Sequence, residues 1–315
     1  MSTAVGLDIG YTNIRGVLLG GDGRVIRRSR TATDPARTPQ RILAQASAMV
    51  RELASGEDIS GIGAGIAGQC DAAIGVVRRG PNLWWDDEPF RDRLSAMASR
   101  PVVLHNDVQM ATLGEWRYGA GKGARDMVCV FTGTGVGGGA VIGGRLLGGT
   151  TGCGAHFGHV SVALDGPRCT CGRNGCVESY AGGMGIAARA RELVTSEPIA
   201  GRHLLGMVGG DADAITAREV SRAASEEDPL AMSIRASAVS ALASGTASVV
   251  NCFDPELVVL GGSVIQGFRG MFEEVRDGIM EAVLPPIRPS LRISRSQLGD
   301  EAGAVGAASL VLRPE

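Results

Sequence analysis

One order of elements occurs twice along the chain. It consists of a strand, a glycine-bearing turn, a second strand and then helices. In the first copy, apolar and β-branched runs predict strands at residues 4–9, 14–19, 24–28, 62–66 and 102–104. Helices are expected at residues 42–53 and 108–118. In the second copy, we expect strands at 127–132, 140–142 and 257–260 and a long helix at 229–250. This twofold order predicts an α/β fold of duplicated domains with a cleft between them.

A glycine-rich segment lies between the two copies. It runs from Gly119 to Gly123, reads Gly-Ala-Gly-Lys-Gly and has the composition of a hinge. We therefore expect a first domain at residues 1–119 and a second at 120–315. Hydrophobic residues make up 44% of the 315 residues, which is enough for a substantial core.

The charge pattern argues against two classes of partner. The net charge is −2 and no block is rich in lysine or arginine, whereas proteins that bind nucleic acid or anionic membranes usually carry a basic patch. The sequence shows no apolar run that we expect to cross a bilayer, and no basic-then-apolar signal pattern near its start. It therefore predicts a cytoplasmic protein.

The segment Asp8-Ile9-Gly10-Tyr11-Thr12-Asn13 places an acid, a glycine and a threonine in a tight turn after the first strand. A carboxylate there can hold Mg²⁺ through water, and the backbone N–H groups of such a turn can bind phosphate. Ordinary hairpins often have the same composition, so this segment alone leaves both interpretations open.

A second glycine-rich segment runs from Thr132 to Gly139 and reads Thr-Gly-Thr-Gly-Val-Gly-Gly-Gly. Glycine lets a backbone approach a polyphosphate, and the two threonines add hydroxyl donors. The segment lacks the Gly-Lys-Ser/Thr ending of a Walker A loop. It also differs from a dinucleotide-binding loop, because that loop opens a helix, whereas residues 140–144 predict a strand and a hairpin turn.

Asn106 and Asp107 stand between the strand at 102–104 and the helix at 108–118. A carboxylate at this place can accept a proton from a substrate hydroxyl as that oxygen attacks a γ-phosphoryl group. Asn106 can hydrogen-bond a neighbouring hydroxyl. Aspartate is also a preferred residue at a helix N-cap, and the local sequence alone favours that interpretation.

Three cysteines, Cys169, Cys171 and Cys176, follow His159 after nine intervening residues. One histidine and three cysteines are the complete tetrahedral ligand set of a closed structural zinc site. Glycines within the cluster permit the sharp turns that bring three thiolates together. Because no ligand position stays open, the metal is expected to organise a loop and not to activate water.

Together these motifs resemble the ROK family, named for repressors, open reading frames and kinases, over essentially the whole chain. The family lies in the superfamily of actin-like ATPases, so the resemblance implies duplicated domains of the sugar-kinase, ribonuclease H-like type. It rests on the two glycine segments, on Asn106-Asp107, and on Gly158-His159 with Cys169-x-Cys171-Gly172-x-x-Gly175-Cys176-x-Glu178. Residues 257–262 are similar to the segment that borders adenosine, and a last helix at about 302–313 is expected to pack back on the first domain.

The resemblance implies a glucokinase-like or N-acylhexosamine kinase-like homodimer that uses ATP, Mg²⁺ and a structural Zn²⁺. Asp107 would be the general base, most simply acting on O6 of glucose or of a glucose-like hexose. The implied sugar contacts are Gly68, Asn82, Asn106, Asp107, His156, His159 and Glu178. The implied nucleotide and magnesium contacts are Asp8, Gly10, Thr12, Asn13, Thr132, Gly133, Thr134, Gly135, Gly261 and Gly262. The implied metal ligands are His159, Cys169, Cys171 and Cys176.

Three features depart from the family pattern. His156 stands where the kinases usually have glutamate, and an imidazole changes the hydrogen bonds that the sugar pocket offers. An amino or N-acylamino hexose, such as glucosamine, 3-amino-3-deoxyglucose or N-acetylmannosamine, therefore stays open beside glucose. Tyr11 stands where a small residue is usual, and its ring either points to solvent or obstructs the nucleotide. The segment Trp84-Trp85-Asp86-Asp87 is either a pocket wall or an exposed loop.

Two other functions compete with the kinase. A sugar-sensing repressor of the family carries a helix-turn-helix domain before the first phosphate loop, and we expect none here because Asp8 lies seven residues from the start. A catalytically silent sugar-binding protein is motivated by Tyr11 and His156. The Asn106-Asp107 pair argues against it, since a pure sensor needs no base.

Overall fold

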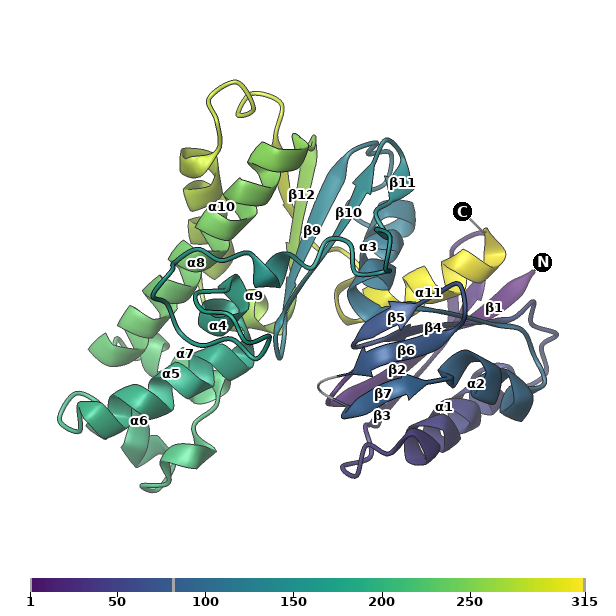
Figure 1. The fold of residues 1–315 in the computed structure, drawn as a ribbon, viewed down its shortest axis with the longest axis horizontal. Coiled ribbons are helices and arrows are strands. Elements are labelled where there is room, and N and C mark those ends of the chain that lie inside the picture. The colour runs from purple at the N-terminus through teal and green to yellow at the C-terminus, as the bar shows by residue number, and fades with distance from the viewer. Residues whose placement is uncertain (1, 81–82, 314–315) are drawn as a thin grey trace. The chain divides into compact units, whose positions relative to one another are not determined.

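The computed structural model describes residues 2–80 and 83–313, and its contacts divide the chain into two compact units (Figure 1). Unit 1 comprises Met1–Met127, Gly139–Ala155 and Ser296–Glu315, and unit 2 comprises Val128–Gly138 and His156–Arg295. Asn82, an expected sugar contact, lies outside the described residues.

The first sheet has the strand order β3-β2-β1-β4-β8. Its strands are β1 (Thr3–Ile9), β2 (Asn13–Gly20), β3 (Val25–Ala32), β4 (Ile62–Ile66) and β8 (Val102–Asn106). β1, β2 and β3 form an antiparallel meander, and β4 pairs in parallel with both β1 and β8. Because the carboxyl ends of parallel strands meet at one edge, β1 and β8 bring Asp8 and Asn106 to the same edge of the sheet.

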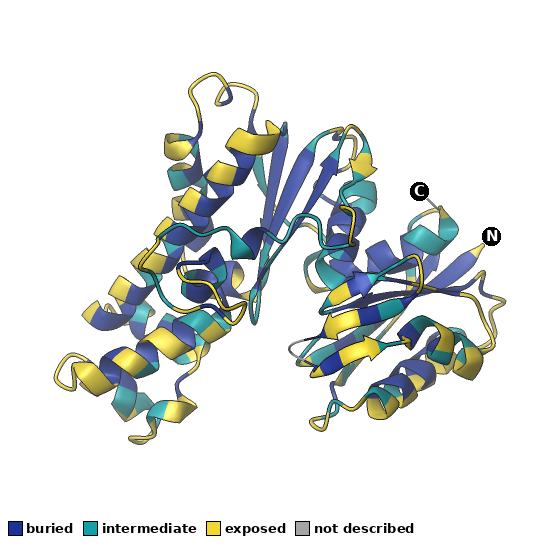
Figure 2. Ribbon diagram, in the orientation of Figure 1, coloured by how far each residue is buried: buried dark blue, intermediate teal, exposed yellow. Residues whose placement is uncertain are grey.

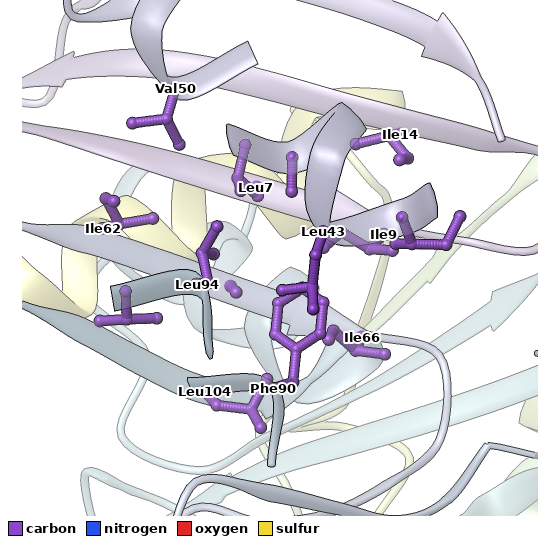
Figure 3. Packing of buried hydrophobic residues seen from close by; sticks show 14 of the residues in the cluster. Leu7, Ile9, Ile14, Leu43, Val50, Ile62, Ile66, Phe90, Leu94 and Leu104 are labelled. Carbon is purple, nitrogen blue, oxygen red and sulfur yellow. The ribbon is translucent and has the colours of Figure 1, made fainter. Parts of the chain in front are cut away.

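Alternating side chains of β1 serve two different cores of unit 1. Leu7 and Ile9 pack with Leu43 of α1 (Pro39–Leu53) and Phe90 of α2 (Phe90–Ala98) (Figure 3). Ala4 instead packs with residues of α11 (Ala302–Leu312), as the two-residue period of a strand requires. The last helix also contacts β4 and α3 (Asp107–Tyr118). A Cβ on Gly63 would overlap the Ala307 carbonyl, so glycine permits this close approach.

Unit 1 also has a small antiparallel sheet that the sequence did not predict. Its strands are β5 (Gln69–Asp71), β6 (Val76–Gly80) and β7 (Trp85–Glu88). These strands are three to five residues long and rich in arginine and aspartate. They therefore lack the apolar alternation by which a strand is recognised.

The second sheet has the order β11-β10-β9-β12-β13. This repeats the order of the first sheet, with β9, β10, β11, β12 and β13 in the places of β1, β2, β3, β4 and β8. Its strands are β9 (Met127–Thr132), β10 (Val136–Ile142), β11 (Arg145–Leu146), β12 (Leu257–Gly261) and β13 (Arg292–Arg295). Most of their residues are buried (Figure 2). The glycine-rich turn is shorter than expected, because β10 begins at Val136 and takes in three glycines.

Apart from the strands of the second sheet that fall within its bounds, unit 2 consists largely of helices. They are η1 (Phe157–His159), α4 (Val177–Ala181), α5 (Gly183–Ser196), α6 (Arg202–Met207), η2 (Ala212–Ala214), α7 (Ala217–Ser225), α8 (Pro229–Phe253), α9 (Ser263–Gly267) and α10 (Met271–Ala282). Unit 1 has the further turn η3 (Gly299–Glu301).

The long helix α8 corrects one expectation, since by length and composition it is apolar enough to cross a membrane. Half of its most apolar stretch is buried, and it packs on α4, α7 and α10. A helix that is apolar because it lies in a core has this environment. Asp228 caps it by accepting a hydrogen bond from Ala231 N, and Pro229 occupies its first turn.

Candidate functional site

Asn106, and not Asp107, is the residue that caps α3. Its Oδ1 accepts hydrogen bonds from the backbone N–H groups of Val108 and Gln109, each at 3.0 Å. Its Nδ2 donates to the carbonyl of Gly68 at 3.0 Å and to Oδ1 of Asp107 at 2.8 Å. Because Asn106 fills the N-cap, Asp107 is not needed as the cap; its Oδ1 accepts hydrogen bonds from Val108 N at 2.9 Å and from Asn106.

Asp107 as a whole residue is partly exposed, but its carboxyl holds its proton more tightly than that of an ordinary aspartate. Desolvation by burial raises its pKa to about 6, although hydrogen bonds from Val108 N and Asn106 act in the opposite direction. A carboxylate with such a pKa is a better proton acceptor than a normal one and is still ionised near neutral pH.

Asp8 lies near Asp107 and is perturbed in the same direction. Burial raises its pKa to about 7, and repulsion from the Asp107 carboxylate adds to the effect. Arg15 opposes the rise, with its Nη1 3.9 Å from Asp8 Oδ2 and its Nη2 2.7 Å from Asp300 Oδ2. Asp107 and Asp300 both raise the pKa of Asp8. A cation bound among these carboxylates would therefore be favourable.

Neither Arg15 nor Asp300 was expected at this site from the sequence. They stand 285 positions apart and meet because α11, which follows Asp300, packs on β1. A Cβ on Gly303, at the start of that helix, would lie 3.0 Å from Asp8 Cγ. In the sequence, Gly303 is only a glycine three residues after Asp300, and nothing in that pattern indicates that it lies against Asp8.

The first glycine hairpin, Gly10 to Asn13, is closed by a hydrogen bond from Gly10 N to Asn13 O at 3.0 Å. In the proposals below it is called the first phosphate hairpin. Arg30 Nε donates to Asn13 Oδ1 at 3.2 Å, and Thr12 is exposed. Tyr11 is half-buried, and its ring lies beneath the Arg37 guanidinium, with 3.9 Å between the guanidinium carbon and the ring centroid.

In unit 2, Thr132 joins the end of β9 to the end of β12. Its Oγ1 donates to Gly261 O at 3.2 Å and accepts from Ile265 N at 3.1 Å. Gly262 has a φ of 97°, and a Cβ there would overlap the backbone of Thr132. Glycine at position 262 is therefore required by both conformation and space.

The second glycine hairpin, Gly133 to Gly135, has hydrogen bonds along most of its backbone. Gly133 N donates to Gly135 O at 2.9 Å, and the carbonyls of Gly133 and Thr134 accept from Gly183 N and Met184 N. A Cβ on Gly133 would meet open space. The hairpin therefore has a fixed backbone with room beside it, as a phosphate cradle needs.

Glu178, which the resemblance assigns to the sugar, binds this hairpin. Its Oε2 accepts a hydrogen bond from Val136 N at 3.0 Å, and a Cβ on Gly135 would overlap that oxygen. Its Oε1 lies 3.8 Å from Cys169 Sγ. The carboxylate thus links the hairpin to the cysteine cluster.

His159, Cys169, Cys171 and Cys176 converge, with one ligand atom from each lying within 4.8 Å of all the others. His159 Nδ1 lies 3.7 Å from Cys169 Sγ, and Cys171 Sγ lies 3.7 Å from Cys176 Sγ. Tetrahedral zinc with Zn–S bonds of about 2.3 Å separates its sulfur ligands by roughly 3.8 Å. The donor set and its spacing therefore fit zinc.

His156 presents a buried nitrogen to this part of unit 2. None of the described residues gives its Nε2 a hydrogen-bond partner. Burial lowers its pKa, and repulsion from His159 lowers it further, while Glu178 acts in the opposite direction. A neutral imidazole with one unused nitrogen can donate to or accept from a ligand, depending on its tautomer.

The described site residues thus form two groups, one in each unit. Asp8, Gly68, Asn106 and Asp107 gather in unit 1. In unit 2, Glu178 connects the hairpin of Gly133 to Gly135 with the cysteine cluster. Two sheets of one strand order, each with a glycine hairpin after its first strand, define the duplicated actin-like ATPase fold.

The chain belongs to the ROK family, because the family model matches residues 4–314. It is 31% identical over 316 residues to a glucokinase of Streptomyces coelicolor, covering 100% of this chain and 99% of the relative. It is 30% identical over 318 residues to an N-acetylmannosamine kinase of Escherichia coli, covering 98% of each. A ROK family glucokinase from Streptomyces griseus, crystallised with glucose and AMPPNP, is 34% identical with a TM-score of 0.85 and coverage of 98% and 99%.

Proposed function

We propose that the chain is an ATP-dependent hexose kinase that transfers the γ-phosphoryl group to O6 of glucose or of a glucose-like hexose. The main support for the proposal is that Asn106 and Asp107 have different roles. Asn106 caps α3, and the Asp107 carboxyl has a pKa of about 6. The relatedness to glucokinases over the whole chain supports the same reaction.

In this proposal Asp107 accepts the proton of the attacking hydroxyl, and Gly68 holds the sugar beside it. The side-chain donors and acceptors of Asn106 are all used within unit 1, so its proposed sugar contact replaces its bond to Gly68 O or to Asp107. Positioning supplies most of the catalysis in phosphoryl transfer, and a general base adds about 10²–10⁴-fold. The remaining sugar contacts are assigned to His156, His159 and Glu178.

The two hairpins are assigned to the nucleotide. The backbone of Gly133 to Gly135, with Thr132 behind it and Gly261-Gly262 bordering the adenosine, binds ATP, and Gly10, Thr12 and Asn13 bind its phosphates. Asp8 holds Mg²⁺ through water, because it is an acid whose ionised form is disfavoured without a cation. Bound Mg²⁺ would neutralise phosphate charge.

The cysteine cluster is assigned to a structural zinc ion. The ion would be held by His159, Cys169, Cys171 and Cys176 and would fix the loop that precedes Glu178. With four protein ligands it has no open position for water, so it takes no part in the chemistry. We further propose that the protein is cytoplasmic and forms a homodimer, as the resemblance implies.

A second candidate substrate is an amino or N-acylamino hexose. The buried Nε2 of His156, which has no hydrogen-bond partner among the described residues, favours this substrate. A glutamate at this position would only accept hydrogen bonds from sugar hydroxyls, whereas a neutral imidazole nitrogen can instead pair with an amino or amide group. The relatedness to N-acetylmannosamine kinases points in the same direction.

The test follows ADP release from Mg-ATP with the zinc-loaded protein across a panel of sugars. The panel contains glucose, mannose, glucosamine, 3-amino-3-deoxyglucose, N-acetylglucosamine and N-acetylmannosamine. Turnover that is strongest with glucose supports the first candidate, and a preference for an amino or acylamino sugar supports the second. Sugar binding by calorimetry without turnover of any member would replace the kinase with a silent binding protein.

A further inference from the structure

Tyr11, Arg37 and Trp84 come from three separate segments of unit 1 and stack together. The guanidinium carbon of Arg37 lies 3.9 Å from the ring centroid of Tyr11 and 5.3 Å from that of Trp84. Tyr11 belongs to the first phosphate hairpin, and Trp84 directly precedes β7. Arg37 therefore joins the phosphate hairpin to the loop before β7.

The backbone of Arg37 is anchored to the core. Its carbonyl accepts a hydrogen bond from Trp85 Nε1 at 2.7 Å, and Trp85 is only 3% exposed and stacks on Phe90 with 5.7 Å between ring centroids. Thr33, in the same loop, donates from Oγ1 to the carbonyl of Gly10 at 2.8 Å. The arginine is thus presented from a rigid base next to the hairpin.

The stack is held together at a cost in stability. Arg37 and Trp84 have φ values of 49° and 57°, a conformation that disfavours L-residues by about 1–2 kcal/mol each. Trp84 is 70% exposed, and the buried Nε of Arg37 has no hydrogen-bond partner among the described residues. Cation–π attraction of about 0.5–2 kcal/mol per ring only offsets these terms. Strain gathered beside a candidate active site indicates a functional role.

We propose that Arg37 is a positioning residue that fixes the first phosphate hairpin relative to the loop before β7. In its catalytic part this rests on the proposed function. Tyr11 follows Asp8, the residue assigned to Mg²⁺, by three residues. Arg37 contacts no assigned reacting group, so it acts through the two rings, and its loss would loosen both loops at once.

The structural arm of the test compares Arg37→Met with Arg41→Met by hydrogen–deuterium exchange of the apo protein. Methionine keeps the apolar stem and removes the guanidinium. Arg41 is a matched control, because its side chain is 69% exposed and it pairs only loosely with Asp34, at 3.8 Å. We expect Arg37→Met to speed exchange about fivefold or more both in residues 10–13 and in residues 83–88, and Arg41→Met to change neither.

The catalytic arm measures kcat and KM for both substrates. Misalignment of bound substrates lowers kcat, whereas loss of uniform binding raises KM. We expect Arg37→Met to lower kcat about tenfold with less than a threefold change in either KM, at a temperature well below its thermal midpoint. A merely structural role would lower the midpoint and leave kcat unchanged.

A double-variant cycle isolates the bridge. Tyr11→Leu and Trp84→Leu should each reproduce most of the loss in kcat, and the double variant should be little worse than either single one, because all three remove the same stack. Strict additivity of the two losses would overturn the proposal. So would faster exchange confined to one of the two loops, or none. If the wild-type protein phosphorylates no sugar, the proposed function fails, and the exchange experiment alone decides whether Arg37 joins the loops.

Discussion

The two glycine hairpins follow the first strand of sheets with the same strand order, yet they are stabilised in different ways. The hairpin of Gly133 to Gly135 has hydrogen bonds to Gly183 and Met184, and the Glu178 carboxylate accepts from the adjoining Val136 N. The hairpin that begins at Gly10 follows an acid whose pKa is raised to about 7 and carries a tyrosine stacked beneath an arginine.

The difference indicates what each hairpin is suited to do. The backbone of the hairpin from Gly10 to Asn13 is also hydrogen-bonded, from Thr33 N to Thr12 O at 3.0 Å and from Thr33 Oγ1 to Gly10 O at 2.8 Å. A prearranged backbone, which loses little entropy on binding phosphate, is therefore common to both hairpins, and the difference between them is electrostatic. The hairpin that begins at Gly10 lies beside Asp8 and Asp107, and ionisation of both carboxyls is unfavourable unless a cation binds between them. One strand order would then support the proposed phosphate cradle in unit 2 and the proposed base and magnesium site in unit 1.

The largest effect is expected for Asp107→Asn. Asparagine keeps the shape and an acceptor for Val108 N but cannot take the hydroxyl proton, so kcat should fall by about 10³-fold or more with sugar affinity nearly unchanged. Single-turnover ADP release and calorimetry measure the two quantities. Asp22→Asn, in an exposed turn of the same unit, is the control and should keep full activity.

Near-full activity of Asp107→Asn would remove the assignment of the chemistry to unit 1. A parallel loss of sugar affinity would instead make Asp107 a binding residue.

The next effect concerns the cysteine cluster. Cys171→Ser removes one of four metal ligands, so we expect loss of bound zinc, a lower thermal midpoint and a rise of about 10-fold to 100-fold in the KM for sugar. The exposed Cys252, which lies outside the cluster, gives the control Cys252→Ser. Metal content by mass spectrometry and kinetics measure both. Unchanged zinc content in Cys171→Ser would show that the four residues are not the ligand set.

A third effect compares two glycines of unit 2. Gly262→Ala places a Cβ against the Thr132 backbone at a φ of 97°, and it should destabilise the protein by about 3 kcal/mol and weaken ATP binding. Gly209 has a φ of 66° but open space around it, so Gly209→Ala should cost only about 1 kcal/mol. Thermal midpoints and nucleotide titrations distinguish the two. Equal effects would show that the contact with Thr132 is not tight.

How far the sequence predicts these features depends on how local they are. The strands that carry Asp8 and Thr132, the Asn106-Asp107 junction and the cysteine cluster all follow from residues close together in the sequence. The pairing of Glu178 with Val136 N spans 42 positions, and that of Arg15 with Asp300 spans 285. No periodicity records such contacts, because they depend on how whole elements pack.

Local patterns also failed where a residue contradicts its usual conformation. Trp84 adopts a left-handed φ that favours glycine, and β10 includes three glycines that usually end a strand. The alternatives left open for Tyr11 and Trp84 concern side-chain direction, which depends on Arg37. Arg37 is separated from them by 26 and 47 positions, so only the folded structure reveals the stack.

The smallest effect is a dependence of stability on pH that comes from Asp107. Its pKa is about 6 in the folded protein against an ordinary value of 3.8, so folding favours the protonated carboxyl. Below about pH 4 the carboxyl is protonated in both states and has no effect on stability. Between pH 4 and 6 it ionises first in the unfolded chain, so the folded protein loses stability as pH rises, by about 3 kcal/mol once both states are ionised.

Asp107→Asn removes this term, so the apo variant should be more stable than the wild type above pH 7 and equal to it near pH 4. Thermal midpoints measured without nucleotide or Mg²⁺ should differ by a few degrees at pH 8. In the wild type, kcat/KM should rise with pH up to about 6 and then level off, because the base must be ionised. A stability difference that persists at pH 4 would have another cause. No difference at pH 8 would mean that burial does not raise the pKa of Asp107, and the contrast between the two hairpins would lose part of its electrostatic basis.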